Sequence, residues 1–76
     1  MNNFETVRDM LSEELGIAPE KIALESKLVE DLGADSISMM VIVTAIQDKY
    51  NIEIPDEAVK NTKTVADMVD FLDKNA

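Results

Sequence analysis

The 76-residue chain carries sixteen acidic and seven basic side chains, a net charge of −9, and it contains no cysteine and no histidine. This charge excludes nucleic-acid-binding proteins, which need basic surfaces against the phosphate backbone, and the lack of cysteine excludes disulfides and thiolate metal sites. The length predicts a single domain, residues 1–76, with one small core and no room for a deep enclosed catalytic cleft.

The chain also lacks the hydropathy pattern of a secreted or membrane-spanning protein. Its first residues contain no basic segment followed by an apolar run, as a signal peptide would. No apolar stretch approaches the roughly 20 residues that are needed to span a bilayer. We therefore expect a cytoplasmic protein without a membrane span.

The first predicted helix shows apolar side chains at three- and four-residue steps: Phe4, Val7, Leu11 and Leu15. Asn2 or Asn3 can cap its start, and Gly16 is a left-handed stop. A long connection follows from residue 17 to 32, with a proline and scattered apolar residues (Ile22, Leu24, Leu28 and Leu32). We predict that these side chains hold this first loop across the core.

A second helix is predicted from Ser36 to Tyr50, and the segment that ends at Pro55 breaks it. Asp56 can cap a short helix through Lys60, and Thr64 with Asp67 forms a capping-box pattern before the last helix. The last helix has its own apolar stripe: Val65, Met68, Val69 and Leu72. The sequence thus predicts an all-α fold, a small four-helix bundle of three principal helices and one short helix, with a long first loop.

The second predicted helix is apolar on two sides. At about 100° per residue, its core face holds Met39, Ile42, Val43, Ile46 and Tyr50. Ile37, Val41, Thr44 and Asp48 lie on the opposite face, with Met40 and Gln47 between the two. Ile37, Met40 and Val41 therefore form an apolar patch beside Ser36, which indicates a contact site. The alternative is that the long loop buries this face.

Ser36 has two interpretations. Asp35 and Ser36 are both good N-cap residues, so the serine can simply start the helix. A hydroxyl at a helix N-terminus is also well placed to carry a phosphodiester, because free N–H groups and the positive end of the dipole favour negative charge there. Gly33 and Ala34 are small enough to let a modifying enzyme approach.

The run Asp31-Leu32-Gly33-Ala34-Asp35-Ser36-Ile37, followed by Ile54-Pro55-Asp56-Glu57, resembles the acyl carrier proteins of fatty-acid and polyketide synthesis over nearly the whole chain. This resemblance implies that a phosphopantetheinyl transferase attaches 4′-phosphopantetheine from coenzyme A to Ser36. The terminal thiol of that arm would carry acyl groups as thioesters between separate enzymes. The protein itself would then be a passive substrate of other enzymes, and we expect a monomer.

Acyl-transferring and chain-elongating partners are expected to dock with basic and apolar patches. Between residues 30 and 57, seven acids face one base, a charge of −6, which steers the chain towards basic surfaces. Partner contacts are predicted at Asp31, Asp35, Ile37, Met40, Val41, Asp48, Asp56 and Glu57. Primary fatty-acid carriers usually have acids where this chain has Ser38, Val41 and Gln47. We therefore predict a specialised carrier with a more apolar interface.

Three other classes of protein are alternatives. A D-alanyl or aminoacyl carrier shares the serine but favours other residues before it. An acidic helical adaptor or calcium protein is a second alternative, although an EF-hand loop counted from Asp31 fails at Ser36, its sixth position, and at Ile42, its twelfth. An enzyme is the weakest, because paired carboxylates need a desolvated pocket to separate their pKa values.

Overall fold

The computed structural model describes residues 2–76. It contains α1 (Asn3–Leu15), a short 3₁₀ turn η1 (Pro19–Lys21), α2 (Ser36–Tyr50), α3 (Asp56–Asn61) and α4 (Val65–Asn75). In this described part no strand forms, and Lys27 and Thr64 make one isolated antiparallel bridge. The predicted all-α architecture is confirmed, with α3 as the short helix. None of the helices in residues 2–76 is long and apolar enough to cross a membrane.

The helix boundaries follow from local capping. The Asn2 side chain accepts a hydrogen bond from the Glu5 N–H at the start of α1, and Gly16 ends that helix with a φ of +67°. Asn51 ends α2 in the same left-handed region, at a φ of +54°. Thr64 and Asp67 form the predicted capping box of α4. These ends match the sequence prediction within one residue.

One capping prediction is wrong. Asp56 does not cap α3: Pro55 occupies the N-cap position, and Asp56 is the first residue inside the helix, which continues to Asn61. The fixed φ of proline, −64° here, suits the entry into a helix without help from a side chain. The Asp56 carboxylate thus remains exposed beside the positive end of the helix dipole.

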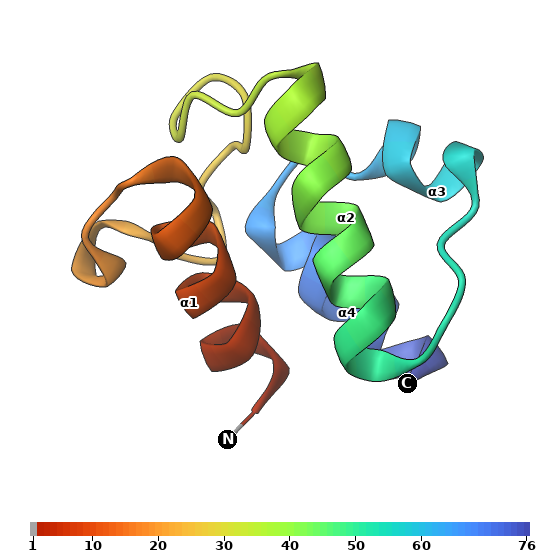
Figure 1. Ribbon diagram of the computed structural model, residues 1–76. Helices are drawn as coiled ribbons and strands as arrows, with labels where there is room; N and C mark the ends of the chain where they lie inside the picture. The colour runs from red at the N-terminus through yellow and green to blue at the C-terminus, as the bar shows by residue number, and fades with distance from the viewer. Residues whose placement is uncertain (1) are drawn as a thin grey trace.

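The three principal helices surround one core (Figure 1). α1 packs against both α2 and α4 and runs opposite to them, while α3 is the helix with the sparsest packing. At the end of the bundle where the chain begins, the Tyr50 hydroxyl donates to Asn3 Oδ1 at 2.9 Å, and Asn3 Nδ2 donates to Asp73 Oδ1 at 2.6 Å. Ser36 lies at the opposite end, where α2 begins.

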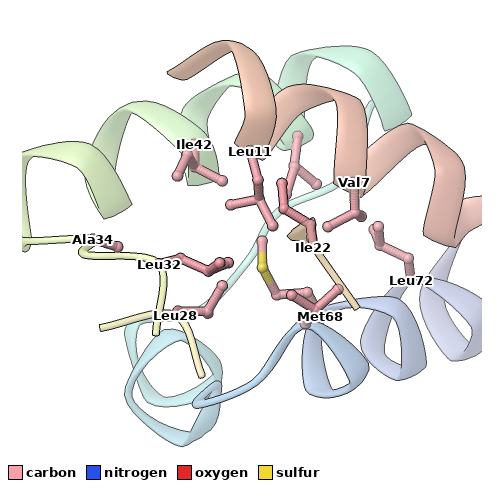
Figure 2. Close-up of a cluster of buried hydrophobic side chains, with 11 residues drawn as sticks. Val7, Leu11, Ile22, Leu28, Leu32, Ala34, Ile42, Met68 and Leu72 are labelled. Atoms are coloured by element: carbon pink, nitrogen blue, oxygen red, sulfur yellow. The ribbon is translucent and has the colours of Figure 1, made fainter. Parts of the chain in front are cut away.

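The long loop forms part of the core, as predicted. Ile22, Leu28 and Leu32 are at most 7% exposed, and Figure 2 shows Leu28, Leu32 and Ala34 entering the cluster from the loop. The remaining members come from the helices: Val7, Leu11, Ile42, Ile46, Val65, Met68 and Leu72. Leu24 is an exception to the prediction, because its side chain is 45% exposed.

Candidate functional site

Ser36 is the first residue of α2, and its side chain is exposed. The N-cap is Asp35, whose Oδ1 atom accepts a hydrogen bond from the Ser38 N–H at 2.8 Å. That N–H, chiefly, and the Ser38 hydroxyl hold the pKa of Asp35 below its usual value. The carboxylate therefore performs the capping, and the Ser36 hydroxyl has no hydrogen-bond partner within residues 2–76. The Ser38 N–H is therefore not free to bind a phosphodiester, contrary to the sequence-based expectation for the N–H groups at this helix start, because it already donates to Asp35.

A tight turn positions Ser36 from the N-terminal side. The Asp31 carboxylate accepts the Lys27 N–H at 2.8 Å, and the Lys27 carbonyl accepts the N–H groups of Asp31 and Leu32 at 2.9 and 3.1 Å. The Ala34 N–H then donates to the Leu28 carbonyl at 2.9 Å. Because Leu28, Leu32 and Ala34 are buried, the turn is fixed to the core at three points.

The two small residues before Asp35 differ in the reason for their size. Gly33 has a φ of +75°, in the left-handed region that favours glycine, and a Cβ atom there would meet nothing within 4 Å. Open space therefore lies beside the backbone of Gly33, three residues before the serine. Ala34 is only 3% exposed, so its size is set by core packing rather than by access to the hydroxyl.

An open groove of about 620 Å³ runs from Ser36 between α2 and α3. Its lining includes two acids, Asp35 and Asp56, and five apolar side chains: Val29, Met39, Met40, Val43 and Val59. Three of these, Met39, Val43 and Val59, also line a small, partly open apolar cavity of about 20 Å³. The groove at Ser36 and this apolar cavity thus share three apolar side chains.

The apolar patch on α2 is open to solvent. Ile37 is 75% exposed, Met40 is 70% exposed and Val41 is 44% exposed. The loop does not cover this face, which was the alternative interpretation. Val29, 64% exposed, is a further apolar side chain of the loop, and it lines the groove with Met40. Its position within an irregular loop gave no periodic signal in the sequence.

The predicted acidic contacts do not form one cluster. Asp35 and Asp56 both line the groove at Ser36. Asp31 is exposed, but its carboxylate is engaged in the turn. Asp48 lies twelve residues along α2, about 18 Å from Ser36 at 1.5 Å per residue. Glu57 is exposed in the first turn of α3.

Fold and site together define a class: small helical domains that display a serine at the start of a helix, next to a groove. The family model described as "Phosphopantetheine attachment site" matches residues 5–72. The chain therefore belongs to this phosphopantetheine-attachment family.

The relatives and the solved structures agree with this assignment. The acyl carrier protein of Wolinella succinogenes is 43% identical over 95% of each chain, and that of Campylobacter curvus is 41% identical over 93% of this chain and 92% of its own length. The structure of the acyl carrier protein from Enterococcus faecalis superposes with a TM-score of 0.84, at 29% identity over 100% of both chains. A protein from Mycobacterium tuberculosis, assigned as an acyl carrier protein, gives a TM-score of 0.88 at 26% identity over 95% of this chain and 96% of that one.

The chain is accordingly a carrier protein rather than an enzyme, and its cofactor is 4′-phosphopantetheine. Family membership implies a phosphopantetheinyl transferase and biosynthetic enzymes as partners. The residues at the start of α2 fit this group. An exposed hydroxyl without an internal partner is accessible for esterification, and the open space at Gly33 and the groove along α2 leave room for a flexible arm.

Proposed function

We propose that Ser36 is the attachment residue and that this chain carries acyl groups between separate enzymes of fatty-acid synthesis, in the cytoplasm. The observation that carries the proposal is the exposed Ser36 hydroxyl, which is released from capping by Asp35 and lies on a groove that shares three apolar side chains with a small apolar cavity. Related polyketide or lipid synthesis is the nearest alternative pathway. We also propose that residues 1–76 act as one carrier domain and as a monomer.

The attachment step follows from the chemistry of a serine and coenzyme A. The Ser36 oxygen bonds to the phosphorus that bears the pantetheine, the bond from that phosphorus to the bridging pyrophosphate oxygen breaks, and adenosine 3′,5′-bisphosphate leaves. The hydroxyl proton passes to a base of the transferase or to water. Once bound, the arm supplies a terminal thiol, which this chain lacks because it has no cysteine. Asp35, the residue before Ser36, offers an exposed carboxylate to a metal ion of the transferase.

The small apolar cavity favours hydrocarbon chains over polyketide chains. Its lining consists of eight apolar side chains and one polar one: Met39, Val43, Ile46, Ile54, Val59, Met68, Phe71, Leu72 and Thr62. The Thr62 hydroxyl already donates to the Ala58 carbonyl at 2.7 Å. A buried ketone would lack a donor there, and an unpaired buried polar group costs about 1–3 kcal/mol. The cavity is small, so admission of a chain requires movement of α3, the most sparsely packed helix.

Loading with two acyl groups of equal length tests the pathway class. An octanoyl chain is expected to raise the Tm of the loaded protein. A chain of the same length with a ketone near its middle should raise the Tm less. An equal or larger effect of the ketone would overturn the preference for hydrocarbon cargo and favour the polyketide alternative.

The partner surface is proposed to combine the patch of Ile37, Met40 and Val41 with the acids around it. Each patch residue is at least 44% exposed, and Asp35 and Asp56 lie on the adjoining groove. An apolar interface predicts that acyl transfer to an enzyme of fatty-acid synthesis depends weakly on salt, since screening acts on charges. Val41→Glu should make that dependence steeper. A steep loss of transfer with salt in the unmodified sequence contradicts the apolar interface.

Intact-mass measurement tests the attachment site. The protein is incubated with a broad-specificity phosphopantetheinyl transferase, coenzyme A and Mg²⁺, beside Ser36→Ala and the matched control Ser38→Ala. The control removes a hydroxyl from the same helical turn but keeps the N–H that Asp35 caps. A gain of one phosphopantetheine is expected for the unmodified protein and the control, and none for Ser36→Ala. A gain in Ser36→Ala would place the attachment elsewhere.

The remaining alternative is a carrier of amino acids, such as D-alanine. An amino-acid adenylating enzyme that charges the modified protein, combined with failure of fatty-acyl loading, would select that alternative. The family match gives the carrier class preference over an acidic adaptor without a prosthetic group.

A further inference from the structure

We propose that Met40 is a site of reversible oxidation: hydrogen peroxide converts its thioether to a sulfoxide, and the sulfoxide weakens the docking of enzymes that act at Ser36. A methionine sulfoxide reductase restores the thioether. This inference rests on the proposed attachment at Ser36 and adds regulation to that site.

The chain offers peroxide few other targets. It has no cysteine and no tryptophan, so its only sulfur atoms are those of five methionines. Oxidation transfers one oxygen atom from peroxide to the Sδ atom, which loses two electrons, while the peroxide is reduced to water. The reductase reverses this change: a pair of its thiols becomes a disulfide, and the oxygen leaves the sulfoxide as water.

Met40 is the most accessible methionine that the structure describes. It is 70% exposed, whereas Met68 is 6% exposed and belongs to the core. Met10 and Met39 are half-buried and pack against that core. Because the sulfur must meet the oxidant in solvent, the first oxygen atom is expected on Met40.

Met40 lies one helical turn after Ser36 in α2. Residues four apart share one face of a helix, and both of these line the groove between α2 and α3. Met40 also belongs to the apolar patch with Ile37 and Val41. We therefore expect an enzyme that reaches the Ser36 hydroxyl to contact the Met40 side chain.

The sulfoxide changes the polarity of this surface. A thioether is apolar and flexible, whereas a sulfoxide is polar and carries an acceptor oxygen. In the free protein water solvates that oxygen, because the side chain is exposed. A docked enzyme would bury it beside Ile37 and Val41, whose side chains offer no donor, and burial of an unpaired polar group is unfavourable. Oxidation thus opposes docking and leaves the fold intact.

The test combines oxidation with the attachment reaction. The protein without the arm is treated with hydrogen peroxide, catalase removes the excess, and peptide mass spectrometry locates each added oxygen. KM and kcat are then measured with the broad-specificity phosphopantetheinyl transferase, and each protein is compared with its own untreated form. Met40→Leu removes the target sulfur. Met10→Leu is the matched control, because it removes a half-buried methionine that lies outside the groove at Ser36.

We expect one oxygen on Met40 before any is added to Met10, Met39 or Met68. In the unmodified sequence and in Met10→Leu, this oxidation should raise KM about tenfold, which corresponds to about 1.4 kcal/mol of docking free energy. The kcat and the Tm should not change, because the sulfoxide affects binding alone. In Met40→Leu the treatment should leave KM unchanged. A methionine sulfoxide reductase should return KM of the oxidised protein to its untreated value.

Four results would overturn the proposal. They are a first oxygen on another described methionine, an unchanged KM after oxidation of Met40, the same rise of KM in Met40→Leu, and a fall in Tm that accompanies the rise, which would indicate damage to the fold.

Intact mass separates the two levels of inference. If the untreated protein gains no phosphopantetheine at Ser36, the proposed function fails and the effect on docking fails with it. The location of the added oxygen does not involve Ser36, so it decides the oxidation site by itself. A protein that is modified at Ser36 equally well before and after oxidation of Met40 removes the regulation alone.

Discussion

The Oε1 atom of Gln47 accepts a hydrogen bond from the backbone N–H of Ile54 at 2.8 Å. Gln47 lies half-buried in the last turn of α2. Ile54 lies in the segment that leads to α3 and lines the small apolar cavity. In the sequence, the missing negative charge at Gln47 indicates a change in the partner interface. The structure gives this side chain a second role, because it positions one wall of the cavity.

Gln47→Ala is expected to lower the free energy of unfolding by about 1 kcal/mol, the usual net contribution of one hydrogen bond. In a domain of this size that corresponds to a fall in Tm of about 4–8 °C. Gln47→Glu keeps an acceptor oxygen and should stay within about 0.5 kcal/mol of the unmodified sequence. Thermal unfolding of both variants checks this, and an equal loss in Gln47→Glu would show that the hydrogen bond is not the cause.

The division of roles between Asp35 and Ser36 gives a second prediction. Ser36→Ala should leave the free energy of unfolding within about 0.5 kcal/mol of the unmodified value, because the hydroxyl makes no capping bond. Asp35→Ala should lower the Tm. Asp35→Asn should lower it less, since asparagine is also a good N-cap. Thermal unfolding of the three variants measures the effect. A lower Tm in Ser36→Ala than in Asp35→Ala would return the capping role to the serine.

The sequence predicted the features that arise from periodic patterns and local capping. Apolar steps of three and four residues located α1, α2 and α4, and Thr64 with Asp67 marked a capping box that the structure confirms. The same periodicity separated the buried face of α2, around Ile42, from the exposed patch that includes Met40.

The features that the sequence did not predict depend on distant partners. The loop reaches the start of α4 through hydrogen bonds from the Leu28 N–H to the Lys63 carbonyl and from the Val65 N–H to the Ser26 carbonyl, each 3.0 Å long. The sequence does not indicate which backbone groups form such long-range hydrogen bonds. Lys27 lies in the loop and Lys60 in α3, yet both line one surface groove. The sequence alone does not predict that they lie close together.

The loop offers a matched pair of leucines for a test of its contribution to stability. Leu28 is 0% exposed and Leu24 is 45% exposed. Leu28→Ala should lower the free energy of unfolding by about 2–5 kcal/mol, as for other leucines removed from a core. Leu24→Ala should cost less than about 1 kcal/mol. Urea unfolding of both variants decides the matter, and similar losses would mean that the loop does not belong to the core.

Asp67 links stability to pH. Its carboxylate accepts the N–H groups of Lys63 and Thr64, and these bonds, that from Lys63 foremost, hold the pKa of Asp67 below the ordinary value of 3.8. The folded state therefore binds the proton less readily than the unfolded state does. The stabilisation is fully present above 3.8 and is lost as the pH falls through the folded-state pKa.

Comparison with Asp67→Asn isolates this contribution, because asparagine keeps an acceptor oxygen and removes the titration. The loss of net negative charge at low pH affects both proteins alike and so cancels in the difference. Asp67 is exposed, so solvent screening limits that difference to about 0.5 kcal/mol near neutral pH. It should shrink as the pH is lowered below 3.8 and through the folded-state pKa of Asp67. Urea unfolding across this range measures it. A difference that stays constant would mean that the capping bonds do not depend on the ionised carboxylate.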